Sequence, residues 1–172
     1  MTLRDQIINS PETLSDVRWA AEQRFRDAEA LLTAGRFTGA VYVLGLAAEM
    51  WLKGACLSLR GLSPATRVSA ALAAARHWFE QHLATAGLPA IAHEGYHGLR
   101  FWAELAVALR RVGGSPLATD VVGQLRHHVV NRLYWSWKID LRYAAIALSE
   151  REAWRVYNDV VWVRQAWRQL LR

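Results

Sequence analysis

Residues 36–53 read RFTGAVYVLGLAAEMWLK, and this stretch decides the fold because it joins an apolar helical face to small residues and a single charge. Its larger apolar residues recur at the three- and four-residue spacing of a core helix: Phe37, Val41, Leu44, Ala48 and Leu52. Gly39 and Gly45 lie inside it, and each costs a helix interior about 1 kcal/mol relative to Ala. We therefore expect a closely approaching neighbour to compensate at these glycines.

Glu49 is the only charged residue between Phe37 and Leu52. A carboxylate at a core position persists only when it is paired or neutralised. Lys53 follows one helical turn later, in the favourable order of acid before base. An arginine from another helix would be the stronger partner, because its guanidinium suits buried ion pairs.

At 172 residues and 53% apolar composition, the chain can bury one sizeable core, and a disordered protein is excluded. The longest apolar run, residues 40–52, has 13 residues and contains Glu49, fewer than the roughly 20 that cross a bilayer. The start, MTLRDQIINSPE, lacks the apolar segment of a secretory signal. We therefore expect a cytoplasmic protein that enters no membrane. The single cysteine, Cys56, is expected to be a core residue rather than a nucleophile.

The net charge of +6 is concentrated in the last third of the chain. Residues 121–172 hold nine basic and four acidic residues, a net +5, whereas residues 1–62 hold seven of each. An anionic partner would therefore meet the C-terminal third. Arginines on helices also serve as solvated side chains or salt-bridge donors, and this interpretation has equal weight.

Helical periodicity runs through the chain, and no segment alternates as a strand does. Three Ser-Pro pairs, at residues 10–11, 63–64 and 115–116, each predict a helix start, because Ser caps free N–H groups and Pro suits the first helical position. The first helix ends near residue 34 at Gly35, and the central one near residues 60–61. A third covers about 64–86, and residues 87–97 read as a loop.

A fourth helix is expected at about 99–112, closed by Gly113 and Gly114. Residues 116–148 contain no proline after 116 and no internal stop, so they predict one long helical segment. Ser149 and Glu152 form a capping-box pattern that starts the last helix. The fold class is therefore all-α, an antiparallel bundle of four to five helices with an inserted helix at about 64–86.

Several residues on the first two helices form a pattern that resembles the HEPN family of small prokaryotic helical proteins. They are Arg26-Asp27-Ala28-Glu29, Leu31-Leu32, Gly35, Gly39-Ala40, Tyr42, Gly45, Ala48, Glu49 and Leu52-Lys53. Later, His97-Gly98-Leu99 is similar to the family's His-Asp-Leu, and Arg142-Tyr143 to an Arg-Tyr on its fourth core helix. The resemblance covers residues 18 to about 150, with residues 64–97 as an insertion in a single domain, 1–172.

The resemblance implies a homodimeric bundle from a family tied to RNA and nucleotides, in which some members are ribonuclease toxins and some partner a small nucleotidyltransferase. Active members carry an arginine and, four to six positions later, a histidine near the start of the last long helix. This chain has Arg126-His127-His128 there but no later histidine. The catalytic pattern is therefore absent at the family's position.

Two other motifs could carry chemistry. Arg76 and His82 match the arginine-to-histidine spacing inside the inserted helix, where the histidine would move the 2′-hydroxyl proton of RNA and the arginine would hold the phosphate. A surface helix with scattered charges explains the same spacing, because short spacings recur by chance.

His93-Glu94-Gly95-Tyr96-His97 fits the His-Glu-x-x-His zinc pattern. Its internal glycine and missing third ligand argue against it, so we expect no metal.

Nine tryptophans and the C-terminal basic residues could bind RNA by stacking on bases and pairing with phosphates. The residues expected to bind are Arg126, Arg132, Lys138 and Arg142. Tryptophan and tyrosine also suit a buried dimer interface.

We interpret the chain as a HEPN-like module, non-catalytic or weakly active, in an RNA- or nucleotide-linked system of the toxin–antitoxin or defence type. It would use no cofactor, form a homodimer, and bind RNA or a nucleotidyltransferase. Glu49, Lys53 and Arg142 would form its internal polar anchor. A metal-independent ribonuclease using Arg76 and His82, and a zinc hydrolase using His93 and His97, are the alternatives.

Overall fold

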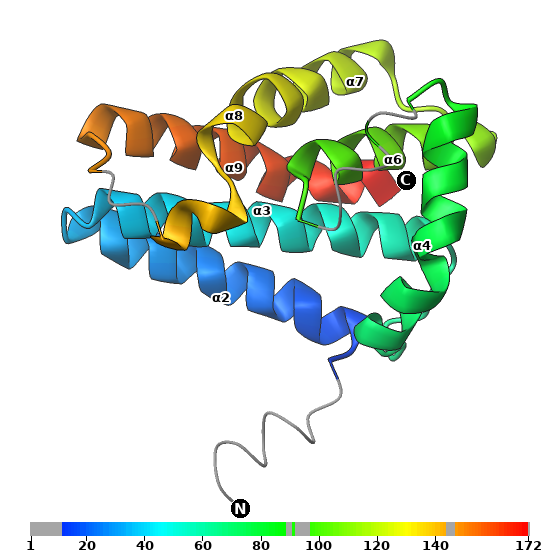
Figure 1. Ribbon diagram of the computed structural model, residues 1–172, viewed down its shortest axis with the longest axis horizontal. Coiled ribbons are helices and arrows are strands. Elements are labelled where there is room, and N and C mark those ends of the chain that lie inside the picture. The colour runs from blue at the N-terminus through cyan, green and yellow to red at the C-terminus, as the bar shows by residue number, and fades with distance from the viewer. Residues whose placement is uncertain (1–11, 89–90, 92–96, 144–146, 172) are drawn as a thin grey trace, which may run out of the picture.

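The computed structural model describes residues 12–88, 91, 97–143 and 147–171, and of residues 76, 142 and 143 it describes the backbone alone. These ranges contain helices and no β-strand, so the expected all-α class is confirmed (Figure 1). In chain order they are α2 (Leu14–Thr33), α3 (Phe37–Leu59), α4 (Val68–Thr85), α6 (Leu99–Val112), α7 (Thr119–Leu125), the π-helix η1 (Arg126–Leu133), α8 (Tyr134–Ser136), the 3₁₀-helix η2 (Ile139–Tyr143) and α9 (Glu150–Leu171).

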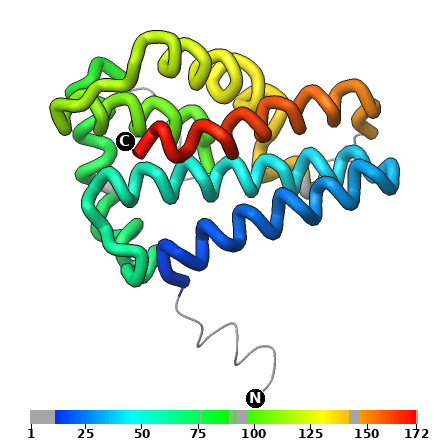
Figure 2. The backbone as a smooth tube through the Cα atoms, turned by 180° about the vertical axis from the view of Figure 1, so that it is seen from behind, coloured from blue at the N-terminus to red at the C-terminus, as the bar shows by residue number. Residues whose placement is uncertain are grey.

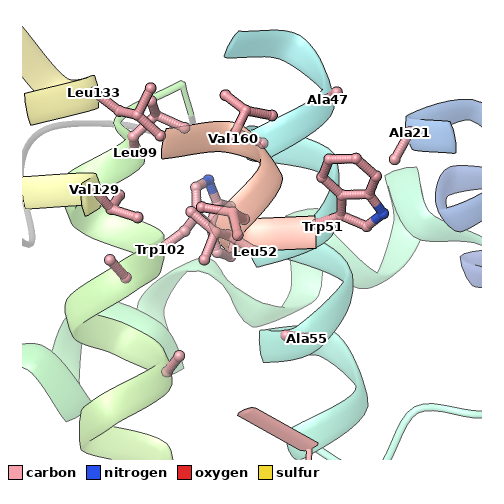
Figure 3. Close-up of a cluster of buried hydrophobic side chains, with 14 of the residues drawn as sticks. Ala21, Ala47, Trp51, Leu52, Ala55, Leu99, Trp102, Val129, Leu133 and Val160 are labelled. Atoms are coloured by element: carbon pink, nitrogen blue, oxygen red, sulfur yellow. The ribbon is translucent and has the colours of Figure 1, made fainter. Parts of the chain in front are cut away.

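Helix α3 forms the centre of the bundle and packs against α2, α6 and α9. In Figures 1 and 2 it runs between α2 on one side and the layer of α6, η1 and α9 on the other. Its buried face includes Trp51 and Leu52. Figure 3 shows Trp51 facing Ala21 of α2, and Leu52 meeting Trp102 of α6 and Val160 of α9. The apolar face of residues 37–52 therefore lies at the centre of the core.

The α2–α3 hairpin follows local sequence signals closely. Thr13 caps α2 through a capping box with Asp16, and Gly35 ends the helix in the left-handed conformation, with φ 69°. Gly61 does the same after α3, with φ 85°. Both predicted helix ends are confirmed.

The expected helix starts at the Ser-Pro pairs are wrong where the structure describes them. Helix α4 begins at Val68 and α7 at Thr119, several residues after Pro64 and Pro116. The carbonyls of Pro64 and Thr66 instead accept the backbone N–H groups of Ser15 and Leu14, at 3.0 Å each. Residues 64–66 thus satisfy the free donors in the first turn of α2 and cannot also be helical. Residues 10 and 11 lie outside the described residues.

Residues 116–148 do not form the one long helix that the periodicity predicts. The helix ends at Ser136, where Trp137 takes an extended conformation (φ −136°, ψ 134°). Its indole lies against Gly45 of α3, and Nε1 donates a hydrogen bond to the Tyr42 carbonyl at 3.0 Å. A Cβ at Gly45 would overlap that ring. The close neighbour expected at Gly45 is therefore Trp137, whereas Gly39 has only an ordinary contact with Leu31, at 3.8 Å.

Helix α3 is longer than the 13-residue apolar run in the sequence, and its burial bears on the expectation that the protein enters no membrane. It has 23 residues and, among the described helices, is the one long and apolar enough to cross a bilayer by length and composition. However, 72% of its most apolar window is buried inside the protein. That burial is typical of the core helix of a water-soluble bundle. Lys53 and Glu49 pair with each other inside it.

Candidate functional site

The polar group at the centre of the core is Glu49, which is 4% exposed. Lys53 Nζ lies 2.7 Å from its Oε1, and the ammonium also lies 5.4 Å from the centroid of Trp102. His97 Nδ1 lies 3.2 Å from both carboxylate oxygens, so it joins α3 to the start of α6. The side chain of Arg142, expected as the second partner, lies outside the described residues. These contacts hold helices together and leave little of Glu49 for chemistry.

A second buried carboxylate, Glu104 of α6, holds Arg126 of η1. Arg126 Nε and Nη2 each donate to one carboxylate oxygen at 2.9 Å, in a two-bond fork. The hydrogen bond to Glu104 raises the pKa of Arg126 above its ordinary value. About half of the Arg126 side chain remains exposed, at 49%. Its guanidinium is thus fixed by Glu104 while one side of it faces solvent.

The third buried carboxylate, Asp159 of α9, binds two η1 side chains at once. His128 Nδ1 lies 2.7 Å from Oδ1, and Arg132 Nε lies 3.0 Å from Oδ2. Asp159 itself is 2% exposed. Because a buried carboxylate is costly unless its oxygens accept hydrogen bonds, Asp159 fixes the positions of both side chains.

The geometry at His128 determines which ring nitrogen carries the proton. A carboxylate can only accept, so Nδ1–H is the donor, and in the neutral ring Nε2 is the free acceptor. The ring stacks on Trp162 at 4.9 Å with an interplanar angle of 17°. His127 lies edge-on to it at 4.9 Å and is exposed. An imidazole held in this way by a carboxylate can act as a base.

Arg126, His127, His128 and Arg132 all lie on η1, an eight-residue π-helix. Such segments are rare and occur often at functional sites. Residues five apart become neighbours in this geometry, and Arg132 Nη1 accordingly lies 3.5 Å from His127 Nε2. We call this region the η1–α9 seam, and it comprises Arg126, His127, His128 and Arg132 of η1, Glu104 of α6, and Asp159 and Trp162 of α9.

A pocket of about 490 Å³ lies beyond the seam, between the α8–η2 segment and the first turns of α9. Lys138, one of the expected binding residues, lines it together with Arg155 and Trp135. The four residues expected to bind thus divide: Arg126 and Arg132 are in the seam, Lys138 is in the pocket, and the side chain of Arg142 is not described.

The predicted ribonuclease pair is only partly described. His82 of α4 lies with Nδ1 2.9 Å from the Trp78 carbonyl, and its ring is tilted by 40° to the Trp78 ring, with the centroids 3.8 Å apart. The Trp78 carbonyl can only accept, so Nδ1 of His82 carries the proton. Unlike a carboxylate, this carbonyl brings no negative charge to the ring. No described carboxylate contacts His82. Only the backbone of Arg76 is described, so the position of its guanidinium relative to His82 is not given by the structure. This pair therefore stays a prediction.

The predicted zinc motif falls largely outside the described residues, since His93 and Glu94 are not described. Its last member, His97, binds Glu49. Within the described ranges, no three His, Cys, Asp or Glu side chains gather as metal ligands.

Sequence reasoning did not single out Glu104 or Asp159 as functional residues. The available signal was the one that identified Glu49, a lone acid on an apolar helical face. Glu104 lies between Phe101 and Leu109, and Asp159 lies beside Val156 and Val160. Comparison of the chain with models of known protein families, with curated proteins and with solved structures finds no match.

Proposed function

We propose that this chain is a HEPN-like RNA-binding module that holds the phosphate backbone of single-stranded RNA at the η1–α9 seam. The observation that carries the proposal is the buried Asp159, which fixes His128 and Arg132 side by side. A donor that is already held in place loses less conformational freedom when a phosphate binds. The resemblance to the HEPN family supports RNA as the partner. In this proposal the protein is a homodimer that binds RNA in the cytoplasm.

The charge on this side of the molecule favours an anion. Arg126 and Arg132 are each held by a buried acid yet keep 49% and 32% of their side chains exposed. Nearer the start of α9, Arg151 and Arg155 are exposed, and Arg155 also interacts electrostatically with Glu152. A set of exposed cations along one side of the molecule attracts a phosphate backbone.

The test is fluorescence anisotropy with a labelled 12-nucleotide RNA of mixed sequence, titrated at several salt concentrations. For single strands, log K falls with log salt by about 0.7 for each phosphate neutralised. We expect a slope that corresponds to several contacts. A wild-type protein that fails to bind this RNA at low salt would refute the proposal.

The decisive variant is Asp159→Asn combined with Arg132→Gln. It removes one negative and one positive charge, so the net charge is unchanged, and the two amides can still form a hydrogen bond. We expect weaker binding and a slope reduced by about 0.7. Arg26→Gln is the control, because Arg26 is an exposed residue of α2 and is not part of the seam. Circular dichroism checks that both variants are folded.

A second candidate function is metal-independent RNA cleavage at the same seam, favoured by the Asp159–His128 pair. His128 Nε2 would take the 2′-hydroxyl proton, and the 2′-oxygen would attack the adjacent phosphorus. The bond to the 5′-oxygen would break; that oxygen would take a proton from water, and His128 would pass its proton to the hydroxide left behind. A cyclic 2′,3′-phosphate and a free 5′-hydroxyl would result.

Cleavage is tested by incubating labelled RNA with the protein in EDTA and analysing the ends of the products. Activity that His128→Ala abolishes and His82→Ala preserves would support the seam. The opposite pattern would support the Arg76 and His82 hypothesis. Intact RNA in every sample would leave binding as the function.

A further inference from the structure

The pocket next to the seam combines one large exposed aromatic face with charged walls. Trp135 is 73% exposed, and its ring is nearly perpendicular to that of Tyr134, with the centroids 5.1 Å apart and an interplanar angle of 84°. Leu141, Leu148 and Val156 contribute apolar surface to the lining. An exposed tryptophan over a cavity of about 490 Å³ provides a stacking surface for a flat ligand.

The charged residues of this pocket suit a nucleotide better than a purely apolar ligand. Lys138 and Arg155 bring two cations; no described residue forms an ion pair with Lys138, and Arg155 interacts electrostatically with Glu152 of the same lining. Of the two acids in the lining, Glu152 accepts hydrogen bonds from Ser149. Asp140 is exposed, and its carboxylate can accept from the N–H groups of a base edge.

Both walls of the pocket lie on the helical segments that carry the seam residues. On one side Trp135 follows Arg132 by three residues, and on the other Arg155 precedes Asp159 by four. Arg132 and Asp159 are themselves in contact. Each offset is about one helical turn, roughly 5.4 Å of rise. A phosphate on Arg132 would therefore place the neighbouring base of the same strand over the pocket.

We propose that this pocket binds one unpaired nucleobase, stacked on Trp135, with its phosphate near Lys138 and Arg155. The inference rests on the proposed RNA binding and deepens it, because it makes the ligand a single strand with an accessible base. A duplex hides the faces of its bases by stacking and could use only the phosphate contacts.

The experiment compares wild type, Trp135→Ala, Trp135→Phe and Trp19→Ala, using the labelled 12-nucleotide RNA as a single strand and as a duplex. Trp19, on α2, is 68% exposed and serves as the matched control. Loss of one stacked base weakens binding about 5- to 150-fold by the usual range for alanine substitution. We expect this loss for Trp135→Ala on the single strand, partial recovery for Trp135→Phe, and no change for Trp19→Ala.

The dependence of affinity on salt distinguishes base stacking in the pocket from phosphate binding at the seam. Trp135→Ala should lower affinity at every salt concentration without changing the slope, because no cation is removed. A salt-dependent wild type that binds duplex as tightly as single strand, or that Trp135→Ala leaves unchanged, overturns the base pocket while the seam stands. A wild type that binds neither RNA overturns both.

Discussion

Replacing Gly45 with alanine should destabilise the protein, although alanine is the better helix former. A methyl group at this position would overlap the indole of Trp137, which is 3% exposed and donates a hydrogen bond to the Tyr42 carbonyl. The obstacle is the rigid ring of a buried side chain rather than the flexible end of an exposed one. The ring must therefore leave its site, or α3 must move away from it.

The magnitude follows from these contacts. Removing a buried tryptophan from a core costs about 3–5 kcal/mol, and replacing glycine within a helix returns about 1 kcal/mol. We therefore expect Gly45→Ala to lower the free energy of unfolding by about 2–4 kcal/mol. For a chain of this size that corresponds to a fall in melting temperature of roughly 5–15 °C.

The assay is urea denaturation followed by circular dichroism, with Gly54→Ala as the control. A Cβ at Gly54 would make only ordinary contacts, 3.8 Å to Arg18 Cγ and 3.9 Å to Leu14 Cδ1. That variant should match or exceed the wild type by up to about 1 kcal/mol. In a Trp137→Ala background, Gly45→Ala should also be neutral or stabilising, because the ring is gone. A Gly45→Ala protein as stable as the wild type would refute the reasoning.

Three further predictions concern individual side chains. Glu49→Ala should lower the free energy of unfolding by about 3–5 kcal/mol, because it leaves the largely buried cation of Lys53, 13% exposed, without its carboxylate; a melting temperature within a degree or two of the wild type would contradict this. Hydrogen bonds from Ser149 hold the pKa of Glu152 below its ordinary value, so this cap stabilises above the unfolded-state pKa and is lost as the pH falls through the lower folded-state pKa. Ser149→Ala should accordingly lower the melting temperature at pH 7, with the difference shrinking below about pH 4, and a difference independent of pH would be inconsistent with this origin. Burial raises the pKa of the Cys56 thiol, so an aromatic disulfide reagent should label it only after unfolding; rapid labelling of the native protein would show that the site opens.

Local patterns were sufficient where a helix end depends on nearby residues. Gly35 and Gly61 end α2 and α3, and Ser149 with Glu152 starts α9. In each case the groups that satisfy the free backbone atoms lie within a few residues of them. The helix at 99–112 was placed correctly for the same reason, with Gly114 at φ 73° just beyond it.

The same patterns failed where a distant segment competes for the backbone. Residues 64–66 match a helix start, yet their carbonyls serve the first turn of α2, about 50 residues away in the chain. Residues 116–148 have helical spacing throughout, yet the helix breaks at Trp137 because Gly45 offers its ring a site on α3. Spacing reports which face of a helix is apolar and carries no information about a partner elsewhere in the chain.

The amino-acid pattern alone was enough to specify an all-helical protein built around residues 37–59, with a carboxylate at Glu49 that needs a partner, because periodicity and burial act along one helix. Tertiary packing chose the partners. His97 joins Lys53 at Glu49, Arg126 finds Glu104, and His128 and Arg132 share Asp159. These pairs are 22 to 48 residues apart in sequence and meet only through the crossing of helices, which an isolated segment cannot encode. The candidate site is accordingly a product of the fold, while its chemical groups are present in the sequence.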